Sequence, residues 1–139
     1  NLNNNLHLNN LGPEPLKKNF NYSYFEQYLK GRKRAVKDIL MDQQFVSGLG
    51  NIYVNEILFL SKIKPTRKVE KLKDYEIKKI IYSTKKILKH SIKSGGSSIK
   101  DFSSSNGKKD KCSNANCDSK IIKINISNRS TFFCSKCQK

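Results

Sequence analysis

The chain has 139 residues, enough for one ordinary domain or two small units that share a boundary, and too few for a large multidomain protein. Lysine and arginine number 28 against 11 acidic residues, a formal charge of +17, which favours a polyanionic partner, nucleic acid above all. The sequence has no apolar run of about 18 residues, and its first residues resemble neither a secretory signal nor a transit peptide, so we expect no membrane partner.

The first part of the chain is predicted to be a linker. Residues 1–21 are rich in asparagine, contain Pro13 and Pro15 and show no apolar periodicity, so we interpret them as a linker or flexible arm. The first residue is not methionine. We therefore expect that a leader has been removed or that the chain is part of a longer protein.

Residues 22–96 are predicted to form a helical domain. Aromatic and aliphatic side chains at helical spacing predict a helix from about Ser23, and a second helix is expected over 35–41. Gly48 and Gly50 predict a tight turn, because glycines permit the positive φ angles that other residues resist, followed by a helix to about Lys62. The longest helix is expected over 74–94, with isoleucines along one stripe and lysines on the opposite face.

The C-terminal region is predicted to be a loop followed by a hairpin. Residues 97–111 are rich in serine, lysine and glycine and are interpreted as a loop. Two runs of β-branched and aromatic residues, 120–126 and 131–133, flank Ser127-Asn128-Arg129-Ser130, which predicts a hairpin with a four-residue tip. We expect this hairpin and the helical domain to have separate cores.

All the cysteines lie in residues 112–139, the segment predicted to be a zinc finger. They are Cys112, Cys117, Cys134 and Cys137, two pairs at the base of the hairpin, where four sulfurs can surround one structural Zn²⁺ at about 2.3 Å. Such a small hairpin buries little apolar area, so metal binding would supply its folding energy. Two disulfides or free thiols are the alternatives.

Three features are candidates for phosphate binding. The segment from Gly48 to Asn51 precedes a helix, and backbone N–H groups at a helix N-terminus attract phosphate, although such a turn is as often purely structural. Lys37 follows the basic run 32–34, which could equally be a solvated helix face. Arg129 at the hairpin tip suits a backbone phosphate, and a polar residue there could equally serve solubility.

Several motifs occur in order along the chain. They are Leu11-Gly12-Pro13-Glu14-Pro15-Leu16, Leu40-Met41-Asp42-Gln43, the segment Gly48-Leu49-Gly50-Asn51-Ile52-Tyr53-Val54-Asn55-Glu56, the segment 95–102 and the final twelve residues 128–139. Together they resemble the C-terminal half of formamidopyrimidine-DNA glycosylase, from about residue 11 to the end. The resemblance implies a mainly α fold, in which a helix–two-turns–helix DNA-binding domain precedes a small zinc-bound β-hairpin finger.

The resemblance also implies a function. Lys37, Asn51 and Arg129 correspond to residues that grip phosphates beside a flipped-out base, and 97–108 corresponds to a loop that closes over that base. The implied partners are double-stranded DNA with a damaged base or an abasic site and a missing N-terminal catalytic domain. We expect a monomer in an intracellular, DNA-containing compartment, as the damaged-DNA-binding part of a base-excision glycosylase and AP lyase.

The sequence departs from the family in three places. The stretch before Cys112 is shorter, which bears on the base-capping loop, and the first cysteine pair has two extra residues. The family's catalytic N-terminal proline is absent, because Asn1 occupies that end and Pro13 lies within the linker motif with its nitrogen acylated. We therefore expect no catalytic residue and no activity in this chain alone. The alternative is a stand-alone basic, zinc-containing RNA- or DNA-binding module, since ribosomal proteins also use a helix–two-turns–helix.

Overall fold

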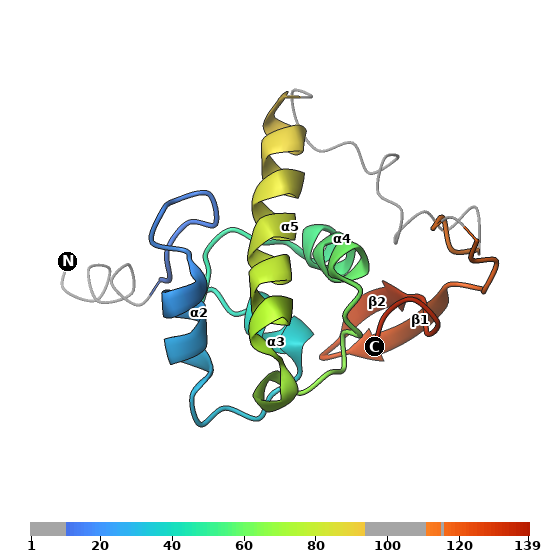
Figure 1. The fold of residues 1–139 in the computed structure, drawn as a ribbon, viewed down its shortest axis with the longest axis horizontal. Coiled ribbons are helices and arrows are strands. Elements are labelled where there is room, and N and C mark those ends of the chain that lie inside the picture. Colours follow the sequence, from blue (N-terminus) through green and yellow to red (C-terminus); the bar gives the residue numbers. More distant parts are fainter. Residues whose placement is uncertain (1–10, 94–110, 115) are drawn as a thin grey trace.

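A computed structural model describes residues 11–93, 111–114 and 116–139 (Figure 1). Apart from Lys111, the predicted loop 97–111 lies outside the described residues, as do the first ten residues of the predicted arm. The elements in order are α2 (Tyr22–Leu29), α3 (Val36–Leu40), α4 (Asn51–Ser61), the 3-10 helix η1 (Val69–Lys71), α5 (Asp74–Lys93), β1 (Ile122–Ile126) and β2 (Arg129–Phe133). None of the helices in this described part has the length and apolarity that a membrane crossing requires.

The predicted mainly helical fold with a small antiparallel hairpin is confirmed. Helix α5 packs against α4 and α2, and Figure 1 shows the hairpin beyond α4 on the side away from α2. Ile77, Ile80 and Ile87 are buried in the main core, as their spacing along α5 predicts. The same core contains a cluster of aromatic rings in which Phe45 contacts Phe20 and Phe25 at ring-centroid distances of 5.8 and 4.8 Å.

Residues 11–21, which the sequence assigns to a linker, pack against the helical domain. The Gly12 amide donates to the Gln43 carbonyl at 2.8 Å, and the Pro13 carbonyl accepts from the Ser47 amide at 3.0 Å. A Cβ atom at Gly12 would overlap the Phe45 carbonyl, so only glycine fits there without a backbone shift. The attachment is made by these backbone groups near the start of the segment and by the buried Phe20 side chain near its end, and neither produces an apolar periodicity in the sequence.

The two glycines of the turn before α4 adopt different conformations. Gly48 has a positive φ of 87°, whereas Gly50 has a φ of −89° and is the N-cap of α4. The positive φ that paired glycines permit is therefore adopted by Gly48 and not by Gly50. Helix α4 ends at Ser61, and Lys62 follows as its C-cap with a left-handed φ of 61°.

The hairpin turn is shorter than predicted. Ile126 pairs with Arg129, so only Ser127 and Asn128 form the turn, and the predicted four-residue tip is wrong. Both turn residues have positive φ angles, 50° and 64°, the combination that matches the twist of two directly connected antiparallel strands. Arg129 is consequently the first residue of β2.

The finger has a small core that is separate from the main helical core, as the sequence predicts, but helix α4 contributes to it. Phe59 of α4 is buried in one cluster with Cys112 and Cys134. The chain after β2 also joins the end of α4, since the Lys139 amide donates to the Lys62 carbonyl at 3.1 Å. The second core is therefore shared between the finger and α4.

Candidate nucleic-acid interface and metal centre

Three side-chain donors converge on one backbone carbonyl, that of Ser130 in β2. The Lys37 ammonium lies 3.3 Å from this oxygen, the Asn51 amide nitrogen 3.0 Å and the Asn55 amide nitrogen 3.2 Å. We call these four residues the Ser130 cluster. They come from α3, α4 and β2, so the cluster forms only when the hairpin docks on the helices.

Lys37 is a buried cation within this cluster. Its side chain is 1% exposed, and its ammonium also donates to the Thr131 hydroxyl at 2.5 Å. Burial and, to a smaller extent, the nearby positive charge of Arg129 lower the pKa of Lys37 from 10.5 to about 8, while Asp38 opposes the shift. An anion placed beside Lys37 would favour the charged ammonium and so offset both causes.

Arg129 precedes Ser130 and is exposed. The turn that carries it is tied to α3, because the Ser127 hydroxyl donates to the Asp38 carboxylate at 2.9 Å. The structure thus brings together the three residues that the sequence predicts to bind phosphate. Lys37 and Asn51 both contact the Ser130 carbonyl, and Arg129 is its neighbour in the chain.

Sequence reasoning missed Asn55, Ser130 and Thr131. Asn51 and Asn55 are four residues apart, which places them on one face of α4, and this spacing is the signal that could have identified Asn55. The Oδ1 atoms of Asn51 and Asn55 are buried and accept no hydrogen bond from the described part of the chain. Two acceptor atoms therefore accompany the donors at the N-terminal end of α4.

Arg32 and Arg34, two members of the basic run 32–34, make contacts within the chain. The Arg32 guanidinium lies 4.0 Å from the centre of the Tyr28 ring and donates to the Tyr28 carbonyl at 2.7 Å. Arg34 forms an ion pair with Asp42 at 2.9 Å. Only Lys37 of the predicted basic group joins the Ser130 cluster.

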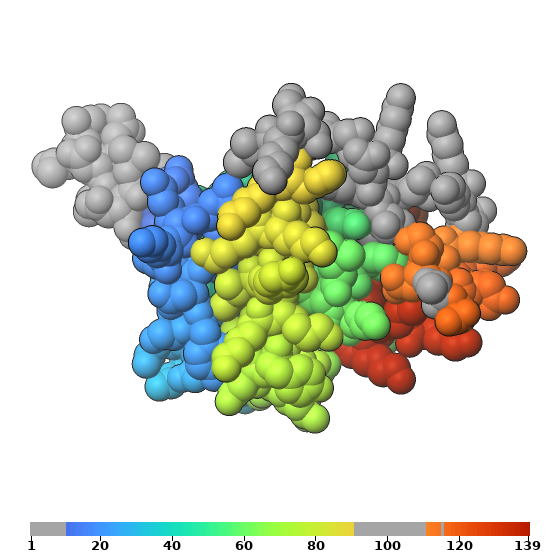
Figure 2. Space-filling view, turned by 45° about the horizontal axis from the view of Figure 1, so that its top comes forward, coloured from blue at the N-terminus to red at the C-terminus, as the bar shows by residue number. Residues whose placement is uncertain are grey.

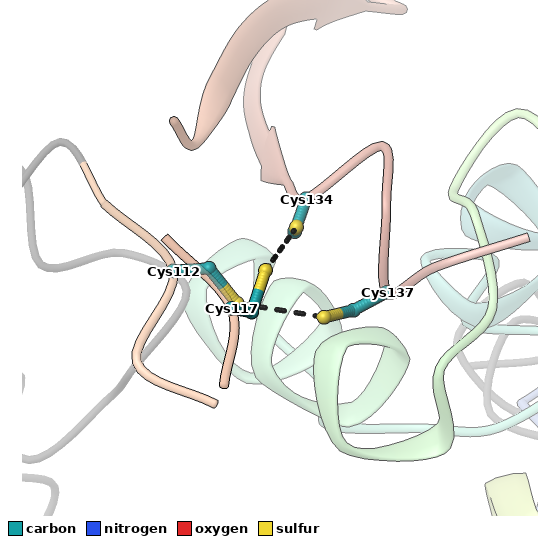
Figure 3. A group of neighbouring side chains, drawn as sticks. All are labelled: Cys112, Cys117, Cys134 and Cys137. Atoms are coloured by element: carbon teal, nitrogen blue, oxygen red, sulfur yellow. Dashed lines mark hydrogen bonds between the residues drawn. The ribbon is translucent and has the colours of Figure 1, made fainter. Parts of the chain in front are cut away.

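The four cysteines form a compact cluster (Figure 3). All four sulfur atoms lie within 4.8 Å of one another, and the distances are 3.7 Å for Cys112–Cys137 and 3.7 Å for Cys117–Cys134. A disulfide bond would need about 2.0 Å, and all four cysteines are free. Four ligands at about 2.3 Å around a tetrahedral ion would lie about 3.8 Å apart. The group is therefore suited to hold a metal ion.

The thiol chemistry fits a cation at the centre. Hydrogen bonding from the Ser119 amide lowers the pKa of Cys117 to about 7, so this sulfur becomes a thiolate near neutral pH. Burial raises the pKa of Cys112 to about 12 and also raises that of Cys134. A bound cation would offset the cost of burying thiolates at these two positions.

The fold and these sites define a helix–two-turns–helix unit with a four-cysteine finger. A comparison with protein families matches residues 11–103 to the formamidopyrimidine-DNA glycosylase H2TH domain. The chain belongs to this family, which confirms the resemblance drawn from the sequence.

Curated relatives extend the match beyond the helical domain. The chain is 42% identical over 144 aligned positions to formamidopyrimidine-DNA glycosylase of Hydrogenovibrio crunogenus, with 95% of this chain and 51% of that protein covered. It is 43% identical to the enzyme of Prochlorococcus marinus, with the same coverage. The chain thus spans about half the length of the curated relatives it matches.

Solved structures share the fold. Formamidopyrimidine-DNA glycosylase of Lactococcus lactis, bound non-covalently to DNA containing an AP site, superimposes with a TM-score of 0.85 at 36% identity, covering 94% of this chain and 51% of that one. The same enzyme in complex with DNA containing Fapy-dG gives a TM-score of 0.88 at 34% identity, covering 99% and 54%.

Proposed function

We propose that this chain is the DNA-gripping half of a base-excision DNA glycosylase and AP lyase. In this role it binds double-stranded DNA that carries a damaged base or an abasic site, while the catalytic half of the enzyme acts on the sugar. The relatives are named as formamidopyrimidine-DNA glycosylases, and the two Lactococcus lactis structures contain AP-site and Fapy-dG DNA. The implied location is an intracellular compartment that contains DNA.

The observation that carries the proposal is the convergence of Lys37, Asn51 and Arg129 on neighbouring residues of one strand. Lys37 supplies a buried charge that an anion would stabilise, and Asn51 supplies an amide at the N-terminus of α4, where the helix dipole favours negative charge. Arg129 supplies an exposed guanidinium that can bind phosphate through two nitrogen atoms. Together they would hold the DNA backbone through adjacent phosphates.

The metal in the finger is proposed to be zinc. Four cysteine sulfurs are the ligand set of structural Zn²⁺ sites, and their separations fit tetrahedral coordination. Cys112, Cys117, Cys134 and Cys137 would all bind as thiolates, and the ion would hold the base of the hairpin that presents Arg129. The zinc is then structural and takes no part in the chemistry on DNA.

Binding, rather than turnover, tests the proposal, because the chain covers about half of the relatives' length. The affinity of a duplex with one tetrahydrofuran abasic-site analogue is measured by fluorescence anisotropy at several salt concentrations, with undamaged duplex and a structured RNA for comparison. We expect the abasic duplex to bind most tightly. A few cationic contacts predict a log–log salt slope of about −3 to −5.

Two substitutions separate a specific grip from a generic basic surface. Asn51→Ala removes hydrogen bonds but no charge, so binding should weaken by about 1–2 kcal/mol with little change in the salt slope. Arg129→Ala removes one charge, so the affinity falls and the slope decreases in magnitude by about one unit. If both variants bind like the parent while neutralising residues 32–34 abolishes binding, the proposed grip is wrong. Tighter binding of RNA than of abasic duplex would instead favour the stand-alone RNA-binding alternative.

A further inference from the structure

The solvent-facing side of α5 combines lysines with an exposed tyrosine. Lys78, Lys79 and Lys86 are exposed, and Tyr82 stands between them with 67% of its side chain exposed. The sequence contains no acidic residue between Glu76 and Asp101. Figure 2 shows α5 running through the middle of one face of the molecule, with α2 on one side and α4 on the other. The exposed Tyr82 ring thus lies among positively charged side chains of α5.

Tyr82 separates two shallow grooves. Lys78 and Lys85 line the first, whose far wall is formed by Phe20 and Tyr22. The second lies on the other side of Tyr82 and is lined by Leu60, Lys79, Ser83 and Lys86. Both grooves are therefore lined by apolar side chains and by Tyr82, with three lysines in the first, which includes Lys18, and two in the second.

The lysines in these grooves are held close to the rings. The Lys85 ammonium donates to the Lys17 carbonyl at 2.9 Å and lies 5.9 Å from the centre of the Phe20 ring. The Lys78 ammonium lies 5.3 Å from the centre of the Tyr22 ring, and that of Lys86 lies 5.9 Å from the centre of the Tyr82 ring. Each groove therefore contains a lysine close to an aromatic ring.

We propose that this face of α5 is a second nucleic-acid site, one that binds a single strand. An unpaired base would stack on Tyr82, and the phosphates on either side of it would lie along the lysine-lined grooves. A duplex would present only its phosphates to this face and would leave the Tyr82 ring unused, since its bases are already stacked on one another. The site is separate from the duplex grip, because no member of the Ser130 cluster belongs to α5.

The test measures binding of a fluorescein-labelled oligo(dT) of about 15 nucleotides to the whole chain by anisotropy. Tyr82→Ala should weaken binding at least about fivefold, since stacking of one base on an aromatic ring is worth about that much or more. Tyr82→Phe keeps the ring and should bind within about twofold of the parent. Tyr75→Ala is the matched control, because Tyr75 is also exposed on α5, at 58%, but lines neither groove.

Charge and selectivity are tested in the same assay. Replacing Lys78, Lys79 and Lys86 together by glutamine should reduce the magnitude of the salt slope by about two units. Asn51→Ala should leave oligo(dT) binding unchanged, whereas Tyr82→Ala should leave binding of the abasic duplex unchanged.

Two outcomes would overturn the inference. One is an equal effect of Tyr82→Ala and Tyr75→Ala on oligo(dT) binding, since stacking on Tyr82 would then be absent. The other is loss of binding to phosphatidylserine vesicles in Tyr82→Ala without any loss of oligo(dT) binding, which would assign this face to a lipid surface. Neither outcome affects the proposed duplex function, which rests on other residues.

Discussion

The low pKa of Lys37 predicts that duplex binding weakens as pH rises above neutrality. In the free chain, burial and the charge of Arg129 hold the pKa of Lys37 at about 8 instead of 10.5. A bound phosphate favours the charged ammonium and so raises this pKa. In the free chain Lys37 therefore loses its proton as the pH rises through 8. Above that pH, Lys37 must take up a proton when DNA binds, and this weakens binding.

The size of the effect follows from the two pKa values. If phosphate restores the pKa of Lys37 to 10.5, affinity falls by about twofold at pH 8 and about tenfold at pH 9, relative to pH 6. The fall would continue until the pKa in the complex is reached. A smaller rise in the pKa on binding would end the fall at a lower pH.

Anisotropy titrations of the abasic duplex from pH 6 to pH 9.5, at constant ionic strength, measure this dependence. Lys37→Met should bind weakly and with no fall across this range. Arg129→Gln should also bind weakly, but with the fall displaced to higher pH, because one cause of the low pKa of Lys37 has been removed. An unchanged affinity between pH 7 and pH 9.5 in the parent, or the same fall in Lys37→Met, would refute the reasoning.

Two further predictions concern stability. The purified chain should contain about one zinc ion, and chelation should release four titratable thiols and abolish duplex binding, because Cys112 and Cys134 share a core with Phe59. Less than about half an equivalent of zinc, with no thiols released, would contradict this. Gly12→Ala should lower the free energy of unfolding in urea by about 2 kcal/mol or more, owing to overlap with the Phe45 carbonyl. At Gly31 an added Cβ atom would meet no neighbour, and the only obstacle is the positive φ of 76°. Gly31→Ala should therefore lower the free energy of unfolding by about 1 kcal/mol. Equal losses of stability in the two variants would refute the proposed overlap at Gly12.

The helices could be predicted because their burial follows a regular spacing. Ile77, Ile80 and Ile87 recur on one side of α5, and the structure buries all three. The cysteine cluster could be predicted for a similar reason, since two pairs flanking a hairpin bring four sulfurs to its base. In both cases the side chains that make the contacts are themselves visible in the sequence.

The Ser130 cluster could be predicted only in part. Its centre is a backbone carbonyl, which every residue possesses, so nothing in the sequence singles out Ser130 as the acceptor. Lys37 follows the basic run in the sequence and nothing there distinguishes it as buried, yet docking of the hairpin leaves it 1% exposed. The attachment at Gly12 and Pro13 was missed for the same reason, because both residues bond through main-chain atoms.

The finger contacts α4 along the whole length of that helix. At the N-terminal end, Asn51 and Asn55 donate to the Ser130 carbonyl, and toward the other end Phe59 packs with the cysteine cluster. Beyond the helix, Gln138 accepts from the Cys134 amide at 2.8 Å and donates to the Ile63 carbonyl at 3.0 Å.

Helix α4 has 11 residues and is therefore about 16 Å long. Attachments at both of its ends prevent the hairpin from pivoting about either one. Arg129 on the hairpin and Asn51 on the helix are consequently held at a fixed separation before any DNA arrives. The backbone positions of these two phosphate contacts are set before binding, so less conformational entropy is lost when DNA binds, which is the physical advantage of a finger and a helix that share a core.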